Sequence, residues 1–145
     1  MEAVPPDTIL HATTVALKGH AVVITGPSGA GKSSLALQLI ALGAQLVSDD
    51  RTILRVNDGV LWAEAPEAIT GLIEARGVGL LPLPPCGPAR VALVVDLSKV
   101  AHSRLPEPQT ETLCGITFPC LHHAPSPHFA AAVLLCLAGV IGDDA

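Results

Sequence analysis

Aromatic residues and runs of basic residues are nearly missing from this chain of 145 residues. It contains two Phe, one Trp and no Tyr, and its formal net charge is -5. A chain without a basic face or rings for base stacking is a poor candidate for a nucleic-acid partner. Half of the residues are hydrophobic and only 14% are charged. We therefore expect one folded domain, residues 1–145, with a core of aliphatic side chains.

Signals for export or membrane insertion are also missing. Residues 1–7 lack the basic stretch and apolar run of a secretory signal. The longest apolar run, from Phe129 to Ile141, is shorter than the roughly 20 residues of a membrane-spanning helix and predicts a helix packed on the domain. No two cysteines have the close spacing of a zinc or redox site. We expect a cytoplasmic protein with reduced thiols and no membrane partner.

The order of the element signals predicts an α/β fold with a mixed β-sheet. Apolar and β-branched runs predict strands at residues 9–17, 21–25, 45–48 and 89–97. Good helix formers from Lys32 to Leu42, followed by a glycine, predict a helix. A hairpin is predicted around Asn57-Asp58-Gly59, and two short strands are predicted around Gly115. The hairpin stands where a doubly wound fold would need a crossover helix, which favours a mixed sheet.

One segment matches the phosphate-binding loop pattern G-x-x-x-x-G-K-[ST] in full, and it consists of Gly26, Pro27, Ser28, Gly29, Ala30, Gly31, Lys32 and Ser33. Glycines let the backbone amides approach phosphate oxygens, and the start of the following helix adds amides and a positive dipole end. Lys32 would reach the β- and γ-phosphates, and the Ser33 hydroxyl would ligate Mg²⁺. The buried strand before the loop and the helix after it are the context that this motif requires. The sequence therefore predicts a site for a nucleoside triphosphate.

Acidic residues follow two of the predicted strands. Asp49 and Asp50 come after strand 45–48, at the carboxyl end where α/β sheets bind ligands. They can hold Mg²⁺ or accept the proton of an attacking hydroxyl; the alternative is a simple turn with Arg51 as their ion-pair partner. Asp96 follows another apolar run and competes with them for a metal role.

Several charged residues and histidines allow two interpretations each. Glu74 and Arg76 stand in an apolar, glycine-rich stretch, where Glu74 is either a magnesium ligand or the partner of Arg76 on one strand face. His11 lies fifteen residues before the P-loop, and a lone histidine is more often structural. A weak metal site is the functional interpretation of the remaining cluster, His122, His123 and His128.

Taken in order, these segments resemble the catalytic C-terminal domain of HPr kinase/phosphorylase, the bacterial enzyme that phosphorylates a serine of the phosphocarrier protein HPr. Three features carry the resemblance: residues 11–12 before the P-loop, residues 46–51 after it, and the stretch 73–81. The resemblance runs from about residue 9 to residue 117 and is to a short form without the N-terminal domain. It implies a P-loop fold of the phosphoenolpyruvate carboxykinase-like type, with flanking helices on a mixed sheet.

The resemblance also implies roles for individual residues. The P-loop would bind ATP, with Asp49 as a supporting acid beside the nucleotide. Ser33 and Glu74 would hold Mg²⁺, and Asp96 would have no metal role. The catalytic residues would be His11, Lys32, Asp50 as the proton acceptor, and Arg104, the last in a loop that is short in this chain.

The same resemblance bounds the expected activity. Pro27 replaces an acidic residue common in the family, and residues 119–125 lack the basic, glycine-containing loop linked to dephosphorylation. Kinase activity toward HPr in carbohydrate regulation is therefore better supported than phosphorolysis. The family forms hexamers, so a homo-oligomer is expected. Two alternatives stay open, a small-molecule P-loop kinase and an ATP-binding regulatory module that transfers nothing.

Overall fold

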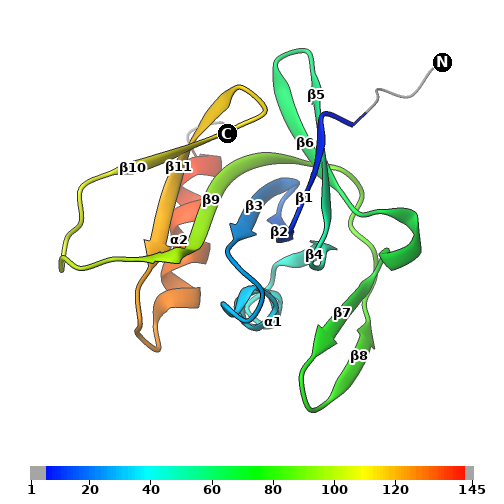
Figure 1. Cartoon of the computed structure of the whole chain (residues 1–145), viewed down its shortest axis with the longest axis horizontal. Coiled ribbons are helices and arrows are strands. Elements are labelled where there is room, and N and C mark those ends of the chain that lie inside the picture. The colour runs from blue at the N-terminus through cyan, green and yellow to red at the C-terminus, as the bar shows by residue number, and fades with distance from the viewer. Residues whose placement is uncertain (1–5, 143–145) are drawn as a thin grey trace.

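The computed structural model of the chain describes residues 6–142, in which eleven strands and two α-helices follow one another (Figure 1). The helices are α1 (Lys32–Ala41) and α2 (Phe129–Gly142), and a short 3-10 turn, η1, covers Glu67–Ile69. The strands are β1 (Thr8–Leu10), β2 (Ala12–Leu17), β3 (His20–Thr25), β4 (Gln45–Ser48), β5 (Thr52–Asn57), β6 (Val60–Glu64), β7 (Leu72–Ala75), β8 (Gly79–Pro82), β9 (Ala89–Val100), β10 (Gln109–Leu113) and β11 (Ile116–His123).

A mixed sheet with the strand order β1-β5-β6-β9-β3-β2-β4 forms the body of the molecule. The long strand β9 pairs in parallel with β3 along one edge. Its other edge first pairs antiparallel with β6 and then in parallel with β11, which in turn pairs with β10. The hairpin of β7 and β8 forms a separate two-stranded sheet. The observed pairings confirm the predicted mixed α/β fold.

Strand direction explains why distant segments meet at one edge of this sheet. Both β3 and β4 are antiparallel to β2, so they run in the same direction. Their carboxyl ends, with the P-loop after β3 and Asp49 after β4, therefore lie at the same edge. Asp96 of β9 also reaches this edge, because it pairs with Thr25, the last residue of β3.

Two hydrophobic cores lie on the two faces of the sheet. On one face, Val22 and Ile24 pack with Leu39 of α1 and Leu137 of α2, so both helices cover the same side (Figure 1). The second core joins strands from distant parts of the sheet, including Val23, Leu54, Leu61 and Phe118. Residues of β5, β6 and β11 thus close over β2, β3 and β9, which curls the sheet. Aliphatic side chains supply nearly all of both cores, as the composition predicts.

The predicted elements are found with two differences. Helices 32–42 and 129–141, the hairpin after residue 52 and the strands on both sides of Gly115 are confirmed. Residues 9–17 form two strands instead of one, because the chain bends at His11 and passes from a pairing with β5 to one with β3. The strand predicted at residues 89–97 is longer, because β9 continues to Val100.

Within residues 6–142, no helix is long and apolar enough to cross a membrane. Residues 1–5, part of the segment inspected for a secretory signal, lie outside the described residues.

Candidate functional site

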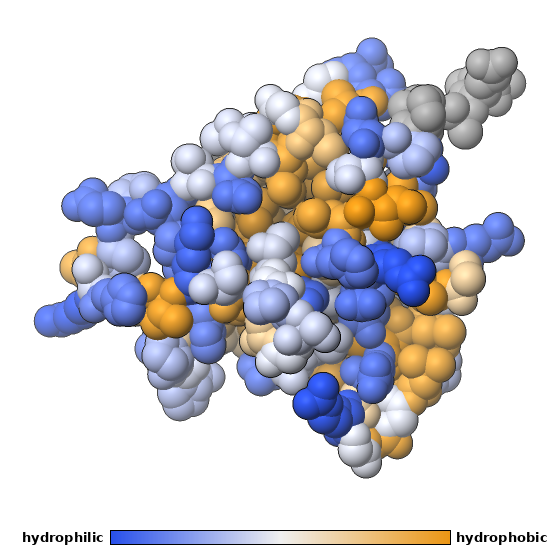
Figure 2. Space-filling model, viewed as in Figure 1, coloured by the Kyte–Doolittle hydropathy of each residue, from blue (hydrophilic) through white to orange (hydrophobic). Residues whose placement is uncertain are grey.

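A cleft of about 350 Å³ opens where α1 begins. P-loop and α1 residues line it together with Asp49, Asp50, Glu74 and Arg76. In Figure 2 the P-loop forms a pale surface in the lower centre, and hydrophilic surface separates it from the apolar surface over β8. The topology thus brings the P-loop, the acidic pair and the charged stretch together, as the sequence predicts for three of its motifs.

Glycines give the P-loop its tight path. Gly26, Gly29 and Gly31 have φ angles of 143°, 85° and 100°, in the region that other residues rarely adopt. A Cβ at Gly26 would also lie 3.2 Å from the Cβ of Ala30 and 3.3 Å from that of Leu97. The loop therefore packs closely against both its own far side and β9, which a larger residue would prevent.

No capping side chain bonds the amides in the first turn of α1. Gly31 caps the helix and has no side chain to bond the first amides, and the first turn contains no acidic residue. The Leu35 amide donates to the Gly31 carbonyl over 3.0 Å, which closes the first turn. The amides that precede it, at Lys32, Ser33 and Ser34, have no partner further back in the helix. With the dipole of α1, such amides are suited to bind an anion at the cleft.

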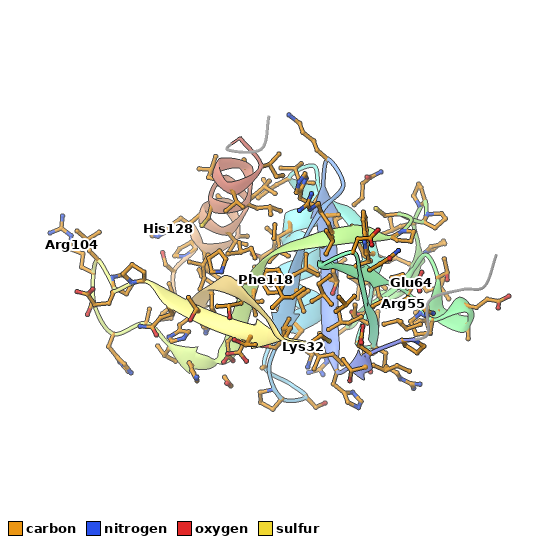
Figure 3. All side chains as sticks on the ribbon, turned by 90° about the horizontal axis from the view of Figure 1, so that it is seen from above. Lys32, Arg55, Glu64, Arg104, Phe118 and His128 are labelled. Carbon is orange, nitrogen blue, oxygen red and sulfur yellow. The ribbon has the colours of Figure 1, made fainter. Side chains whose placement is uncertain are left out.

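Lys32 lies across the P-loop with only 8% of its surface exposed. Its Nζ donates hydrogen bonds to the carbonyl of Gly26 over 2.8 Å and to that of Pro27 over 3.2 Å. Figure 3 shows Lys32 near the middle of the molecule, below the sheet ends. The ammonium group therefore lies beside the loop that would surround the phosphates.

Asp49 joins three elements through its carboxylate. Oδ1 accepts hydrogen bonds from Ser33 Oγ over 2.6 Å and from Thr13 Oγ1 over 3.1 Å, and Oδ2 accepts one from the Glu74 amide over 3.0 Å. These contacts tie β4 to α1, β2 and β7. Asp49 is thus the residue that holds the predicted magnesium ligands Ser33 and Glu74 beside one another.

Asp50 presents an exposed carboxylate to the cleft from a left-handed backbone with φ of 68°. Its amide donates to Thr13 Oγ1 over 3.1 Å, and the Arg51 amide donates to the Asp49 carbonyl over 2.8 Å. The alternative of a turn neutralised by Arg51 is not what the chain forms: in the range 6–142, neither aspartate makes an ion pair with it.

Glu74 and Arg76 both line the cleft. They do not form an ion pair with each other, since the ion pairs of the described residues include neither. Ser33, Asp49 and Glu74 thus line the same cleft. Hydroxyl and carboxylate oxygens are the ligands that Mg²⁺ prefers, so this donor set suits that ion.

Three other candidates do not line the cleft. His11 is exposed and directly precedes Ala12, which pairs with Thr25 at the start of the P-loop. The Asp96 carboxylate bonds a residue of its own strand: it accepts hydrogen bonds from the Ser98 amide over 2.9 Å and from the Ser98 hydroxyl over 2.6 Å. Arg104 is exposed on the loop between β9 and β10, and Figure 3 shows it at one end of the molecule, whereas Lys32 lies near the middle.

The clustered histidines make other contacts. The His123 ring meets Phe129 edge to face with ring centres 5.5 Å apart, and Nδ1 of His128 is 2.7 Å from Ser126 Oγ. Among the described residues, no group of three or more His, Cys, Asp or Glu side chains is arranged to hold a metal ion.

The family model of the HPr Serine kinase C-terminal domain matches residues 2–86, which is more than half of the chain and includes the whole cleft. The chain belongs to this family. The match ends before Arg104, so it gives that residue no support.

Individual relatives agree with the family. HPr kinase/phosphorylase of Clostridium botulinum (strain Eklund 17B / Type B) is 42% identical over 76 residues, covering 52% of this chain and 25% of that protein. HPr kinase/phosphorylase of Geobacillus sp. (strain WCH70) is 42% identical over 100 residues, 63% of this chain and 32% of that protein. The matched region is thus a quarter to a third of the length of these relatives.

A solved structure shares the HPr kinase fold. The HPr(Ser) kinase/phosphatase from Coxiella burnetii superposes with a TM-score of 0.76 over 95% of both chains, at 24% identity. The predicted fold class is therefore confirmed along nearly the whole chain, beyond the end of the family match.

Thr13 is the site residue that the sequence does not reveal. It bonds Asp49 and the Asp50 amide although it is fully buried in β2. In the sequence it is one of two adjacent threonines in an apolar run, and threonine is an ordinary strand residue. Only the pairing of β2 with β4 shows that it faces the acidic pair.

Proposed function

We propose that this chain is an ATP-dependent protein-serine kinase whose acceptor is HPr, the phosphocarrier of the sugar phosphotransferase system, and that it acts in the cytoplasm. The observation that carries the proposal is the Asp49 carboxylate, which bonds Ser33 and the backbone of Glu74 while Asp50 stands beside it in the cleft. Relatives that match this region are named HPr kinase/phosphorylase. Regulation of carbohydrate metabolism follows as the role of such a modification.

Binding of the ATP phosphates is assigned to the P-loop and the first turn of α1. The amides at the start of α1 would donate to phosphate oxygens, with the helix dipole favouring their negative charge. Lys32 would place its ammonium against the transferring phosphoryl group. Positioning and charge stabilisation are the main demands of phosphoryl transfer, so a few fixed groups suffice.

Ser33 and Glu74 would ligate Mg²⁺, and Asp49 would orient both. When bound, Mg²⁺ neutralises charge on the β- and γ-phosphates. The Asp49 carboxylate keeps the Ser33 hydroxyl turned toward the cleft through the 2.6 Å hydrogen bond between them. Asp49 also holds the backbone of β7 in place at Glu74, because the Glu74 amide donates a hydrogen bond to Oδ2.

Asp50 would accept the proton of the attacking serine hydroxyl. Its carboxylate is exposed in the cleft, where a protein acceptor can reach it, whereas the Asp49 carboxylate is occupied by three donors. His11 would act from the start of the P-loop, and Arg104 would act from the loop between β9 and β10. Without a basic loop at residues 119–125, the forward reaction is favoured over phosphorolysis.

The test is transfer of labelled phosphate from ATP·Mg²⁺ to purified HPr, with an HPr whose acceptor serine is replaced by alanine as the control. We expect label on wild-type HPr alone, and Asp50→Asn should abolish it. Asp58→Asn is the matched control, since Asp58 is an exposed aspartate that also has a left-handed backbone, with φ of 52°. Retained transfer in Asp50→Asn would remove the proposed base.

A negative result in that assay has two interpretations, which further measurements distinguish. ATP turnover with a small hydroxyl compound, and none with HPr, would make the chain a small-molecule P-loop kinase. Tight ATP binding with no transfer to any acceptor would make it a regulatory module. Light scattering of the purified protein would test the proposed homo-oligomer, a hexamer by family resemblance.

A further inference from the structure

Buried hydroxyl groups gather around the turn that carries both aspartates. Among residues 6–142, the buried polar or charged residues are Lys32 and four hydroxyl-bearing residues, which are Thr13, Thr14, Ser48 and Thr52. Ser48 and Thr52 directly flank the turn at 49–51, and the two threonines lie opposite on β2. Burying a hydroxyl costs free energy unless it is hydrogen-bonded, so the bonds of these four groups identify what each one holds.

Three of the four hydroxyls hold only the ends of the turn. Thr52 Oγ1 donates to the Ala12 carbonyl over 2.9 Å and lies 2.9 Å from Thr14 Oγ1. The Ser48 hydroxyl donates to the Arg51 carbonyl. None of these bonds involves a carboxylate, so they fix the chain path of the turn and leave its acidic side chains free to rotate.

Thr13 makes different contacts, because neighbouring residues on a strand point to opposite faces. Its hydroxyl donates to Asp49 Oδ1 over 3.1 Å and accepts the Asp50 amide hydrogen over 3.1 Å. One side chain therefore bonds the carboxylate of the first aspartate and the backbone of the second. It does so with no exposed surface of its own, so water has no access to replace it.

Both bonds act on groups that would otherwise have other orientations. Asp50 has φ of 68°, which costs a non-glycine residue free energy, and an acceptor for its amide offsets part of that cost. Asp49 Oδ1 also accepts from Ser33, so its rotation about the side-chain bonds decides where the Ser33 hydroxyl points. Thr13 adds a second donor to that oxygen and so holds the rotation more firmly than Ser33 and the Glu74 amide do without it.

We infer that Thr13 is a positioning residue for phosphoryl transfer: its buried hydroxyl sets the Asp49 carboxylate that orients Ser33 and fixes the left-handed backbone that turns Asp50 toward the acceptor. This inference rests on the proposed function for the role of Asp50. The effect of Thr13 on Asp49 and Ser33 concerns only magnesium-dependent nucleotide binding, so it does not depend on which acceptor the chain phosphorylates.

The sharpest comparison is Thr13→Ser against Thr13→Ala. Both variants lack the methyl group of threonine, and they differ from each other only in the hydroxyl. Thr14→Val is the control for a lost hydroxyl that is equally buried on the same strand but does not contact the acidic pair. Thermal unfolding of each variant checks that the domain is folded.

Three measurements follow the two bonds. Hydrogen exchange at the Asp50 amide should quicken in Thr13→Ala, because its acceptor is lost. The Mg²⁺ concentration for half-maximal binding of a fluorescent ATP analogue should rise roughly 10-fold or more, as for the loss of other groups that orient metal ligands. In the HPr assay, kcat should fall while KM for ATP at saturating Mg²⁺ stays unchanged. Thr13→Ser should match the wild type in all three measurements, and Thr14→Val should change each of them far less than Thr13→Ala does.

The outcomes separate this inference from the proposed function. If Thr13→Ala and Thr13→Ser behave alike in exchange and in Mg²⁺ dependence, the hydroxyl has no positioning role and the inference is overturned, even where the wild type phosphorylates HPr. If the two differ in exchange and in Mg²⁺ dependence but the wild type transfers nothing to HPr, the positioning of Asp49 stands and the proposed acceptor is wrong.

Discussion

The hydroxyl of Ser33 donates a 2.6 Å hydrogen bond to the carboxylate of Asp49, which links the start of α1 to the end of β4. P-loop enzymes commonly hold Mg²⁺ with the P-loop Ser or Thr and an aspartate that follows a neighbouring strand. Here two aspartates lie at the same edge of the sheet, Asp49 directly after β4 and Asp96 within β9. Only Asp49 faces Ser33, because Asp96 is bonded to Ser98 beside it.

Replacing Asp49 by asparagine should therefore weaken magnesium-dependent nucleotide binding, by about 10- to 100-fold in the Mg²⁺ concentration required. The side-chain oxygen of asparagine is neutral, so it accepts hydrogen bonds from Ser33 and Thr13 more weakly than the charged carboxylate oxygen does. The measurement is titration of Mg²⁺ against a fluorescent ATP analogue. Asp96→Asn is the matched control and should leave that titration unchanged; the opposite pattern would assign the metal role to β9.

A methionine at position 32 should lower kcat for phosphoryl transfer by about 10²–10³-fold, the usual effect of removing one group that stabilises developing charge. Methionine has a similar length and is tolerated in a buried position. The bonds from the Lys32 ammonium to Gly26 and Pro27 would also be lost, at a cost of about 1 kcal/mol in the free energy of unfolding. Urea unfolding and single-turnover kinetics measure the two effects separately. An unchanged kcat would show that the ammonium does not act on the phosphoryl group.

Gly26→Ala should destabilise the fold by about 1–3 kcal/mol, because φ of 143° is strained for any residue with a Cβ. The added carbon would also meet Ala30 and Leu97 at 3.2 and 3.3 Å. Gly87→Ala is the control, since a Cβ there meets nothing within 4 Å and the backbone is not left-handed. Equal unfolding free energies for the two variants would contradict the close packing of the P-loop on β9.

Local sequence signals predicted the elements of this fold well, and the P-loop and hairpin most clearly. The glycines at 26, 29 and 31 and the run Asn57-Asp58-Gly59 specify backbone shapes within a few residues, so no distant partner is needed. The break of the first strand at His11 was not predictable in this way. It arises because β1 and β2 pair with different strands, and the choice of strand partner is a property of the whole sheet.

The sequence predicts which residues line the site better than it predicts the contacts and the role of each one. Asp49 and Asp50 are adjacent and identical in the sequence, and only the structure shows that Asp49 is bonded to three donors while Asp50 is exposed. Thr13 was missed because nothing local marks a buried threonine as the partner of residues 36 positions away. Contacts of that range depend on register, which a linear pattern does not contain.

Arg104 tests how far sequence resemblance extends past the matched region. Its predicted catalytic role comes from its position in a short loop, and Figure 3 shows Arg104 well away from Lys32. We expect Arg104→Ala to leave magnesium-dependent nucleotide binding unchanged, because the loop lines no part of the cleft. Transfer to HPr should fall by ~10²-fold if the guanidinium reaches the phosphoryl group when the acceptor is bound. Arg90→Ala, at an exposed arginine near the other end of β9, is the matched control and should leave both measurements unchanged. Unchanged transfer in Arg104→Ala would remove this residue from the catalytic set, and weakened nucleotide binding would mean that the loop contacts the nucleotide itself.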